Sequence, residues 1–164
     1  MSHTSYHTLP QPQEISIREK EDAMGAYLMM FAALGAGLPL PFINLLASVI
    51  YYYVNRNKGR FVRFHLVQSL WSQIPVTLLN GILVVYTIKK WISDYEFDKI
   101  YLSFLGVAVV ANILYFIFSI LAAIAARQGR FYYFLFFGRL AYHQVFKKSQ
   151  EDSISKDYTN KPPV

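Results

Sequence analysis

Polar side chains recur at the spacing of one helical face within an otherwise apolar stretch, at His65, Gln68, Ser69 and Ser72. Offsets of three, four and seven residues place such side chains in a single stripe on a helix. Amides, hydroxyls and an imidazole are suited to hydrogen bonding between helices, each bond contributing about 0.6–2 kcal/mol in a membrane. The stripe therefore predicts helix–helix hydrogen bonds. A hydrophilic path, or a groove that contacts a polypeptide, is the alternative.

Two other apolar stretches carry polar pairs with helical spacing. Asn44 and Ser48 are four residues apart, and Asn112 and Ser119 are seven apart. Because polar side chains are costly in lipid, these faces should turn inward. The predicted intramembrane polar face consists of Asn44, Ser48, Ser69, Ser72, Asn112 and Ser119. No Asp or Glu occurs in these stretches, which argues against a proton-coupled transporter.

The histidines do not form a catalytic or metal-binding pattern. His65 follows Arg63 closely, and a single histidine at such a boundary is typical of an interfacial hydrogen-bonding residue. His3, His7 and His143 are too scattered for ligand spacing, and the chain has no cysteine. The sequence therefore predicts a protein that is not an enzyme, with no catalytic, cofactor or metal site.

The elements that must position these residues are defined by where the charges lie. Only 16% of the 164 residues are charged, against about 25% in typical soluble domains, and 54% are hydrophobic. The charges gather in Glu14–Asp22, Arg56–Arg63, Lys89–Lys99, Arg127–Arg139 and Lys147–Lys161. The stretches between the clusters have the length, about 20 residues, that crosses a bilayer. This pattern predicts an all-α polytopic membrane protein.

Three to four transmembrane helices are expected. Phe64–Ile88 and Tyr101–Ala126 are two clear spans, whereas the first apolar run, Ala23–Asn55, is interrupted at Pro39 and Pro41. Two prolines so close together break a helix. Either the two halves complete one broken crossing, or they form a tight hairpin.

An aromatic stretch follows the last span and predicts a different kind of helix. Phe131–Tyr142 is too short to cross and should form a C-terminal interfacial helix. The predicted organisation is a polar N-terminal arm (1–22), a helical transmembrane domain (23–146) and a polar C-terminal tail (147–164). The arm lacks the features of a cleavable signal peptide, so the first hydrophobic segment should remain as an anchor.

The distribution of basic residues predicts orientation. Arg56–Arg63 and Arg127–Lys148 flank the two clear spans and should both be cytoplasmic, whereas Lys89–Lys99 balances its charges and should lie outside. The C-terminus is then cytoplasmic, and the side of the N-terminus depends on the number of spans. The net charge of +6 indicates contact with anionic lipid at the cytoplasmic face rather than with nucleic acid.

Two short segments that flank the spans resemble each other. Lys58–Phe61 and Gln128–Phe131 each place glycine, arginine and phenylalanine in succession. Glycine ends a helix, arginine meets headgroups and the aromatic ring enters the interface. Contact with a partner or with lipid is predicted for Arg56, Arg60, Phe61, Arg63, Phe64, His65, Gln68, Arg127 and Arg130.

The segment Gly59–Ser69 also carries a family resemblance. An aromatic-x-Arg-Phe-His sequence that opens a transmembrane helix, after a proline-rich broken run, resembles the plastid inner-envelope protein-import subunit of about twenty kilodaltons. It also resembles that subunit's small bacterial relatives of unknown function, and Gly129–Tyr133 is similar to their later Gly-x-aromatic-aromatic segment. The resemblance implies a bundle of about four helices, with Phe61, Arg63, Phe64 and His65 as the matching boundary motif. Because no transit peptide is present, a bacterial inner membrane is expected.

These observations lead to a functional expectation. The resemblance implies a non-enzymatic integral subunit of a larger inner-membrane assembly, one for protein translocation or insertion, with other membrane proteins as partners. Two alternatives stay open: a small oligomeric pore or solute carrier lined by the polar stripe, and a lipid-interacting envelope protein that acts through its arginines.

Overall fold

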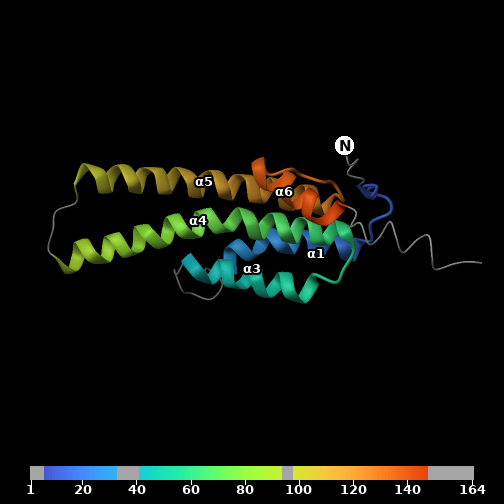
Figure 1. Ribbon diagram of the computed structural model, residues 1–164, viewed down its shortest axis with the longest axis horizontal. Helices are drawn as coiled ribbons and strands as arrows, with labels where there is room; N and C mark the ends of the chain where they lie inside the picture. Colours follow the sequence, from blue (N-terminus) through green and yellow to red (C-terminus); the bar gives the residue numbers. More distant parts are fainter. Residues whose placement is uncertain (1–5, 33–40, 94–97, 148–164) are drawn as a thin grey trace, which may run out of the picture.

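The computed structural model describes residues 6–32, 41–93 and 98–147, and these residues are helical throughout apart from connecting segments (Figure 1). The helices are α1 (Ile17–Leu28), the 3₁₀ turn η1 (Met29–Phe31), α3 (Pro41–Asn55), α4 (Arg60–Ile92), α5 (Lys99–Arg127) and α6 (Leu135–Phe146). The all-α prediction is confirmed. Pro39 and most of the proline-rich break lie outside the described residues.

Helices α4 and α5 form a long antiparallel hairpin. Their 33 and 29 residues correspond to about 50 and 44 Å of helix. Both are long and apolar enough to cross a membrane, and only 22% and 28% of their most apolar windows are buried. Such exposure fits lipid-facing helices rather than the core of a soluble protein. Within the described part of the chain, these two helices alone meet the length and hydropathy expected of a span.

Helices α1 and α3 form a shorter antiparallel hairpin against the first half of α4 (Figure 1). Lys58, which follows α3, pairs with Asp22 in the middle of α1 at 2.6 Å. The Tyr51 hydroxyl donates to the Asp22 carbonyl at 3.1 Å. This arrangement matches the hairpin alternative. Its helices have 12 and 15 residues, about 18 and 22 Å, which is shorter than a hydrocarbon core of about 30 Å.

A capping box fixes the start of α1. The Glu19 amide donates to Ser16 Oγ at 3.2 Å, and the Ser16 amide donates to the Glu19 carboxylate at 3.1 Å. These reciprocal bonds satisfy two amides that the first turn leaves open. The helix then runs on to Leu28, so the predicted boundary at residue 22 between an arm and a transmembrane domain falls inside α1.

A glycine in a left-handed conformation ends α5. Gly129 has a φ of +76°, and the amides of Gly129 and Arg130 donate to the carbonyls of Ala126 and Ala125, both at 2.9 Å. This is the hydrogen-bond pattern of a Schellman motif. The chain then runs extended through residues 131–134, and α6 begins at Leu135. The aromatic helix thus starts four residues later than predicted.

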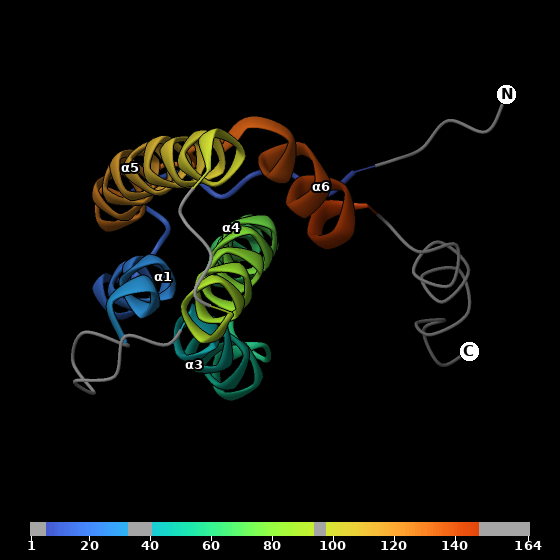
Figure 2. The ribbon, with the colours of Figure 1, turned by 90° about the vertical axis from the view of Figure 1, so that its left-hand side faces the viewer.

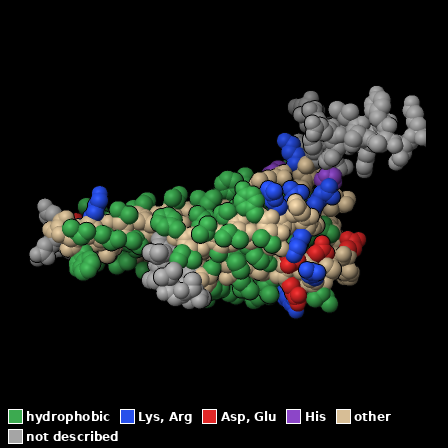
Figure 3. Space-filling model, turned by 90° about the horizontal axis from the view of Figure 1, so that it is seen from below, with side chains coloured by type: hydrophobic (Ala, Val, Ile, Leu, Met, Phe, Trp, Pro, Cys, Tyr) green, Lys and Arg blue, Asp and Glu red, His purple; other side chains and the backbone are tan. Residues whose placement is uncertain are grey.

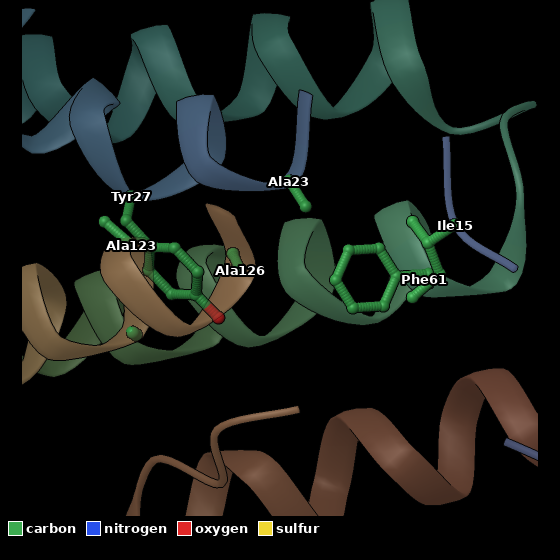
Figure 4. Close-up of a cluster of buried hydrophobic side chains, with 7 residues drawn as sticks. Ile15, Ala23, Tyr27, Phe61, Ala123 and Ala126 are labelled. Carbon is green, nitrogen blue, oxygen red and sulfur yellow. The ribbon is translucent and has the colours of Figure 1, made fainter. Parts of the chain in front are cut away.

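Seen end-on, α4 lies at the centre of the thicker half, with α1, α3, α5 and α6 around it (Figure 2). Small side chains allow α5 to approach α1 there, since Ala122, Ala123 and Ala126 are at most 5% exposed. They pack with Tyr27 and Phe61 in one buried cluster (Figure 4). The core therefore gathers at one end of the molecule.

The segment before α1 closes this end. The His7 amide donates to the Phe146 carbonyl at 2.9 Å, and the Tyr6 hydroxyl lies 2.8 Å from His143 Nδ1. The Tyr6 ring stacks on Tyr142 with ring centres 5.3 Å apart. The first described residues are thereby attached to the C-terminal turn of α6.

Candidate functional site

A buried hydrogen-bond network joins α1 to α4. The Gln68 amide nitrogen donates to the Tyr27 hydroxyl at 2.6 Å, and that hydroxyl lies 2.9 Å from His65 Nδ1. All three side chains are at most 1% exposed. Loss of any of these hydrogen bonds would destabilise the fold, because an unpaired polar group away from water is costly in free energy. The network is therefore a fixed part of the core.

Gln68 also holds the extended segment between α5 and α6. Its amide nitrogen donates to the Tyr132 carbonyl at 2.8 Å, and its carbonyl oxygen accepts from the Phe134 amide at 3.1 Å. One side chain thus replaces the backbone partners that a helix would have given residues 132 and 134. This explains why α6 begins at Leu135 rather than at Phe131.

Aromatic rings enclose His65. Its ring centre lies 4.6 Å from that of Phe61, 5.1 Å from Phe64 and 5.9 Å from Phe131. Phe61 and Phe131, the equivalent residues of the two similar segments, meet edge to face at 5.1 Å. The structure therefore brings together two segments that the sequence showed only as separate boundaries.

A second polar group continues along α4. Ser69 Oγ donates to the Ala26 carbonyl at 2.7 Å, and Ser72 Oγ donates to the Ser69 carbonyl at 2.9 Å. Gln73 donates to Ser48 Oγ. Gln73, which sequence analysis missed, follows Ser69 by four residues and so continues the same stripe. That spacing was the signal that could have found it.

Farther along the hairpin, Asn80 and Asn112 exchange hydrogen bonds. Their amides donate to each other's carbonyl oxygens at 2.9 and 2.8 Å, and Asn112 also donates to the Ala108 carbonyl at 2.7 Å. Asn112 therefore lies on the seam between α4 and α5. Its partner is Asn80, which the sequence analysis did not single out.

Breaking this pair one side at a time is expected to have unequal effects. Asn112→Leu leaves Asn80 with neither of its amide bonds and should lower the free energy of unfolding by about 1 kcal/mol. Asn80→Leu should cost less, because Asn112 keeps its bond to Ala108. Denaturant unfolding in detergent micelles measures both.

The double variant is the control for this prediction. Asn80→Leu with Asn112→Leu leaves no amide unpaired and should recover most of the stability lost in Asn112→Leu. Additive losses in the double variant would contradict the pairing.

An ion pair and a helix N-cap stabilise the tip of the hairpin. Asp98 Oδ1 accepts from the Tyr101 amide at 2.8 Å, and Asp98 Oδ2 accepts from Lys90 Nζ at 3.1 Å. The hydrogen bond from the Tyr101 amide lowers the pKa of this exposed carboxyl most, and the hydrogen bond from Lys90 lowers it further. Asp98 is therefore charged at neutral pH and caps the start of α5.

Lys and Arg side chains gather at the opposite, basic end of the molecule, with Asp and Glu side chains beside some of them (Figure 3). Two of its cations are paired with α1, since Arg127 meets Glu21 and Lys58 meets Asp22, both at 2.6 Å. Arg60 Nη2 lies 3.2 Å from His7 Nε2. These partners remove part of the charge that the sequence assigned to the cytoplasmic surface.

The residues predicted to contact a partner or lipid separate into two groups. Phe61, Phe64, His65 and Gln68 are at most 2% exposed and contact other parts of this chain, so they are not available at the surface. Their aromatic and amide groups satisfy one another inside the bundle. The exposed group consists of Arg56, Arg60, Arg63, Arg127 and Arg130.

The predicted polar face is likewise divided. Ser48, Ser69, Ser72 and Ser119 are buried in the thicker half, whereas Asn112 lies on the two-helix seam and Asn44 is only partly buried.

No group of three His, Cys, Asp or Glu side chains that could hold a metal ion occurs within residues 6–32, 41–93 and 98–147.

Comparison with known families gives a match over most of the chain. The model described as the magnetosome magnetite crystal formation protein family (MamF/MmsF) matches residues 20–141. No curated protein and no solved structure matches. The family match contradicts the resemblance to the plastid import subunit, and the expected role in protein translocation is wrong with it. The pore, carrier and envelope alternatives gain no better support.

Proposed function

Because the chain belongs to the magnetosome magnetite crystal formation protein family, we propose that it is a multi-pass protein of the magnetosome membrane that acts in magnetite formation. In this proposal the tip between α4 and α5 faces the mineral. The basic end and the C-terminus face the cytoplasm. The observation that carries the proposal is the family match. The matched region contains a hairpin of two long apolar helices, which has an excess of basic residues at one end and balanced charges at the tip.

The orientation is supported by the exposed arginines. Arg56, Arg60 and Arg63 precede or open α4, and Arg127 and Arg130 close or follow α5, so all five lie at one end. Excess basic residues favour the cytoplasmic side of a membrane. One crossing by α4 then carries Ser93 to the other side, and a second crossing by α5 returns the chain.

The tip carries side chains that are suited to binding the iron from which the crystal is built. The sequence supplies three carboxylates there, at Asp94, Glu96 and Asp98. Carboxylates are oxygen ligands, the class that hard cations prefer. The described member, Asp98, has a side chain that is 48% exposed, and its two oxygens accept hydrogen bonds from the Tyr101 amide and from Lys90 Nζ. A cation or an oxide surface would have to compete with the Lys90 ammonium for this carboxylate.

Crystal growth in cells tests this proposal. In a magnetite-forming bacterium that lacks its own copy, the wild-type chain should restore crystal size, measured by electron microscopy. The variant Asp94→Asn, Glu96→Gln, Asp98→Asn should reach the membrane at the normal level and leave crystals about as small as in the deletion strain. Asparagine still caps a helix, so α5 should keep its start.

The control neutralises three acids of the C-terminal part of the sequence, with Glu151→Gln, Asp152→Asn and Asp157→Asn. This variant should restore crystal size in full. Full restoration by the tip variant would refute the role of the tip. Unchanged crystals in the deletion strain would refute the function itself.

The cysteine-free sequence gives a direct check on orientation. Ser93→Cys lies at the tip and Gln13→Cys at the basic end, and both positions are exposed. On intact isolated magnetosomes, a membrane-impermeant maleimide should label Gln13→Cys and spare Ser93→Cys. The reverse pattern would contradict the orientation.

A further inference from the structure

A polar cavity of about 450 Å³ opens at the turn between α3 and α4. Its lining consists of Tyr52, Arg56, Asn57, Lys58 and Arg63. The end of α3, the connecting turn and the first turn of α4 thus place three cations around one space. This arrangement of positive charges favours the binding of an anion.

The charge in this cavity is only partly compensated by carboxylates of the described residues. Lys58 is paired with Asp22 at 2.6 Å, but neither Arg56 nor Arg63 forms an ion pair within the described residues. Arg56 is held by the ring of Tyr53, with 5.0 Å between its guanidinium carbon and the ring centre. By contrast, Arg127 already has a carboxylate partner.

The lining has the chemistry of a phosphate site. A guanidinium presents a planar fork of donors that matches two phosphate oxygens. Two arginines therefore supply paired donors, and Tyr52 and Asn57 add a hydroxyl and an amide. We propose that this cavity binds the phosphate group of an anionic phospholipid.

The exposed face of α3 identifies a lipid as the source of the phosphate. Phe42, Leu46, Ile50 and Tyr53 are 56–59% exposed and follow one another at helical spacing. This apolar stripe ends one turn before Arg56. Helix α3 extends over about 22 Å, more than the hydrocarbon depth of one leaflet, about 15 Å. Acyl chains can lie along the stripe while the headgroup occupies the cavity.

Binding of defined short-chain lipids to the purified full-length chain tests the site. Phosphatidylglycerol should bind, phosphatidylcholine should bind more weakly, and Arg56→Gln with Arg63→Gln should weaken phosphatidylglycerol binding about tenfold or more. Arg56→Lys with Arg63→Lys keeps the charge but loses the forks, so it should give an intermediate loss. All these side chains are exposed, and the fold should persist.

The matched control removes two arginines from the same end, Arg130→Gln with Arg139→Gln, neither of which lines the cavity. Its affinity for phosphatidylglycerol should equal that of the wild type. Equal losses in both double variants would overturn the site in favour of diffuse attraction. Inorganic phosphate binding as tightly as phosphatidylglycerol would overturn the lipid assignment, and equal binding of phosphatidylcholine would overturn the preference for anionic lipid.

Discussion

Gln68→Met should lower the free energy of unfolding by about 3 kcal/mol, although the two side chains have similar size. Gln68 is fully buried and bonds to Tyr27, to the Tyr132 carbonyl and to the Phe134 amide. Methionine fills the space but leaves two backbone groups unpaired. Each such group costs about 1–3 kcal/mol, which is more than a normal hydrogen bond contributes.

Denaturant titration of the detergent-solubilised protein, followed by circular dichroism, measures this loss. Gln144→Met is the matched control, because Gln144 is exposed and, among the described residues, its side chain accepts a hydrogen bond from Trp71 alone. The control should unfold within about 0.5 kcal/mol of the wild type. Equal stability of the two variants would show that Gln68 does not hold the segment between α5 and α6.

Gly138→Ala should lower stability by about 2 kcal/mol, although the same change inside an open helix is favourable. Gly138 lies within α6, and a Cβ there would be 2.6 Å from Tyr133 Cα and 2.9 Å from Gln68 Oε1. The nearest atom belongs to the backbone and cannot rotate away. Either α6 must move, or the bonds made by Gln68 must break.

Gly106→Ala is the control for this steric argument. Gly106 lies within α5, and apart from the adjacent residues and backbone of its own helix no heavy atom lies within 4 Å of a Cβ at this position. Alanine there should raise stability by up to about 1 kcal/mol, because it only reduces the flexibility of the unfolded chain. Thermal unfolding of both variants should therefore give shifts of opposite sign. Shifts of the same sign would contradict the close approach at Gly138.

The sequence was sufficient to predict those features that depend on local length and spacing. Helices α4 and α5 follow from uncharged stretches between charged clusters. The polar stripe on α4 follows from helical spacing, and the structure confirms that Ser69 bonds to another helix. Such patterns are properties of single segments, so no knowledge of the packing was needed.

Features that depend on distant contacts could not be predicted in this way. The start of α6 is set by Gln68, more than 60 residues earlier in the chain. Phe61 and His65 are likewise buried by partners that are distant in the sequence. Phe61 contacts Phe131, and His65 contacts Tyr27. A pattern within one segment contains no information on these partners.

The same reasoning explains why the family resemblance was misleading. Phe61, Phe64 and His65 form an aromatic enclosure inside the chain, and Arg63 alone of the boundary motif is exposed. A motif that stabilises the start of a helix reports on packing at a membrane boundary. It carries little information on function, and the family match over residues 20–141 is the more specific signal.

The unequal halves of the molecule have a mechanical consequence. All the described helices pass through or pack at the basic end, whereas only α4 and α5 continue to the tip (Figure 1). In the orientation proposed above, with the basic end toward the cytoplasm, the chain would displace more lipid from the cytoplasmic leaflet than from the opposite one. Many copies together then act as wedges that favour a bilayer convex on its cytoplasmic side, which is the curvature of a small vesicle closed around its contents.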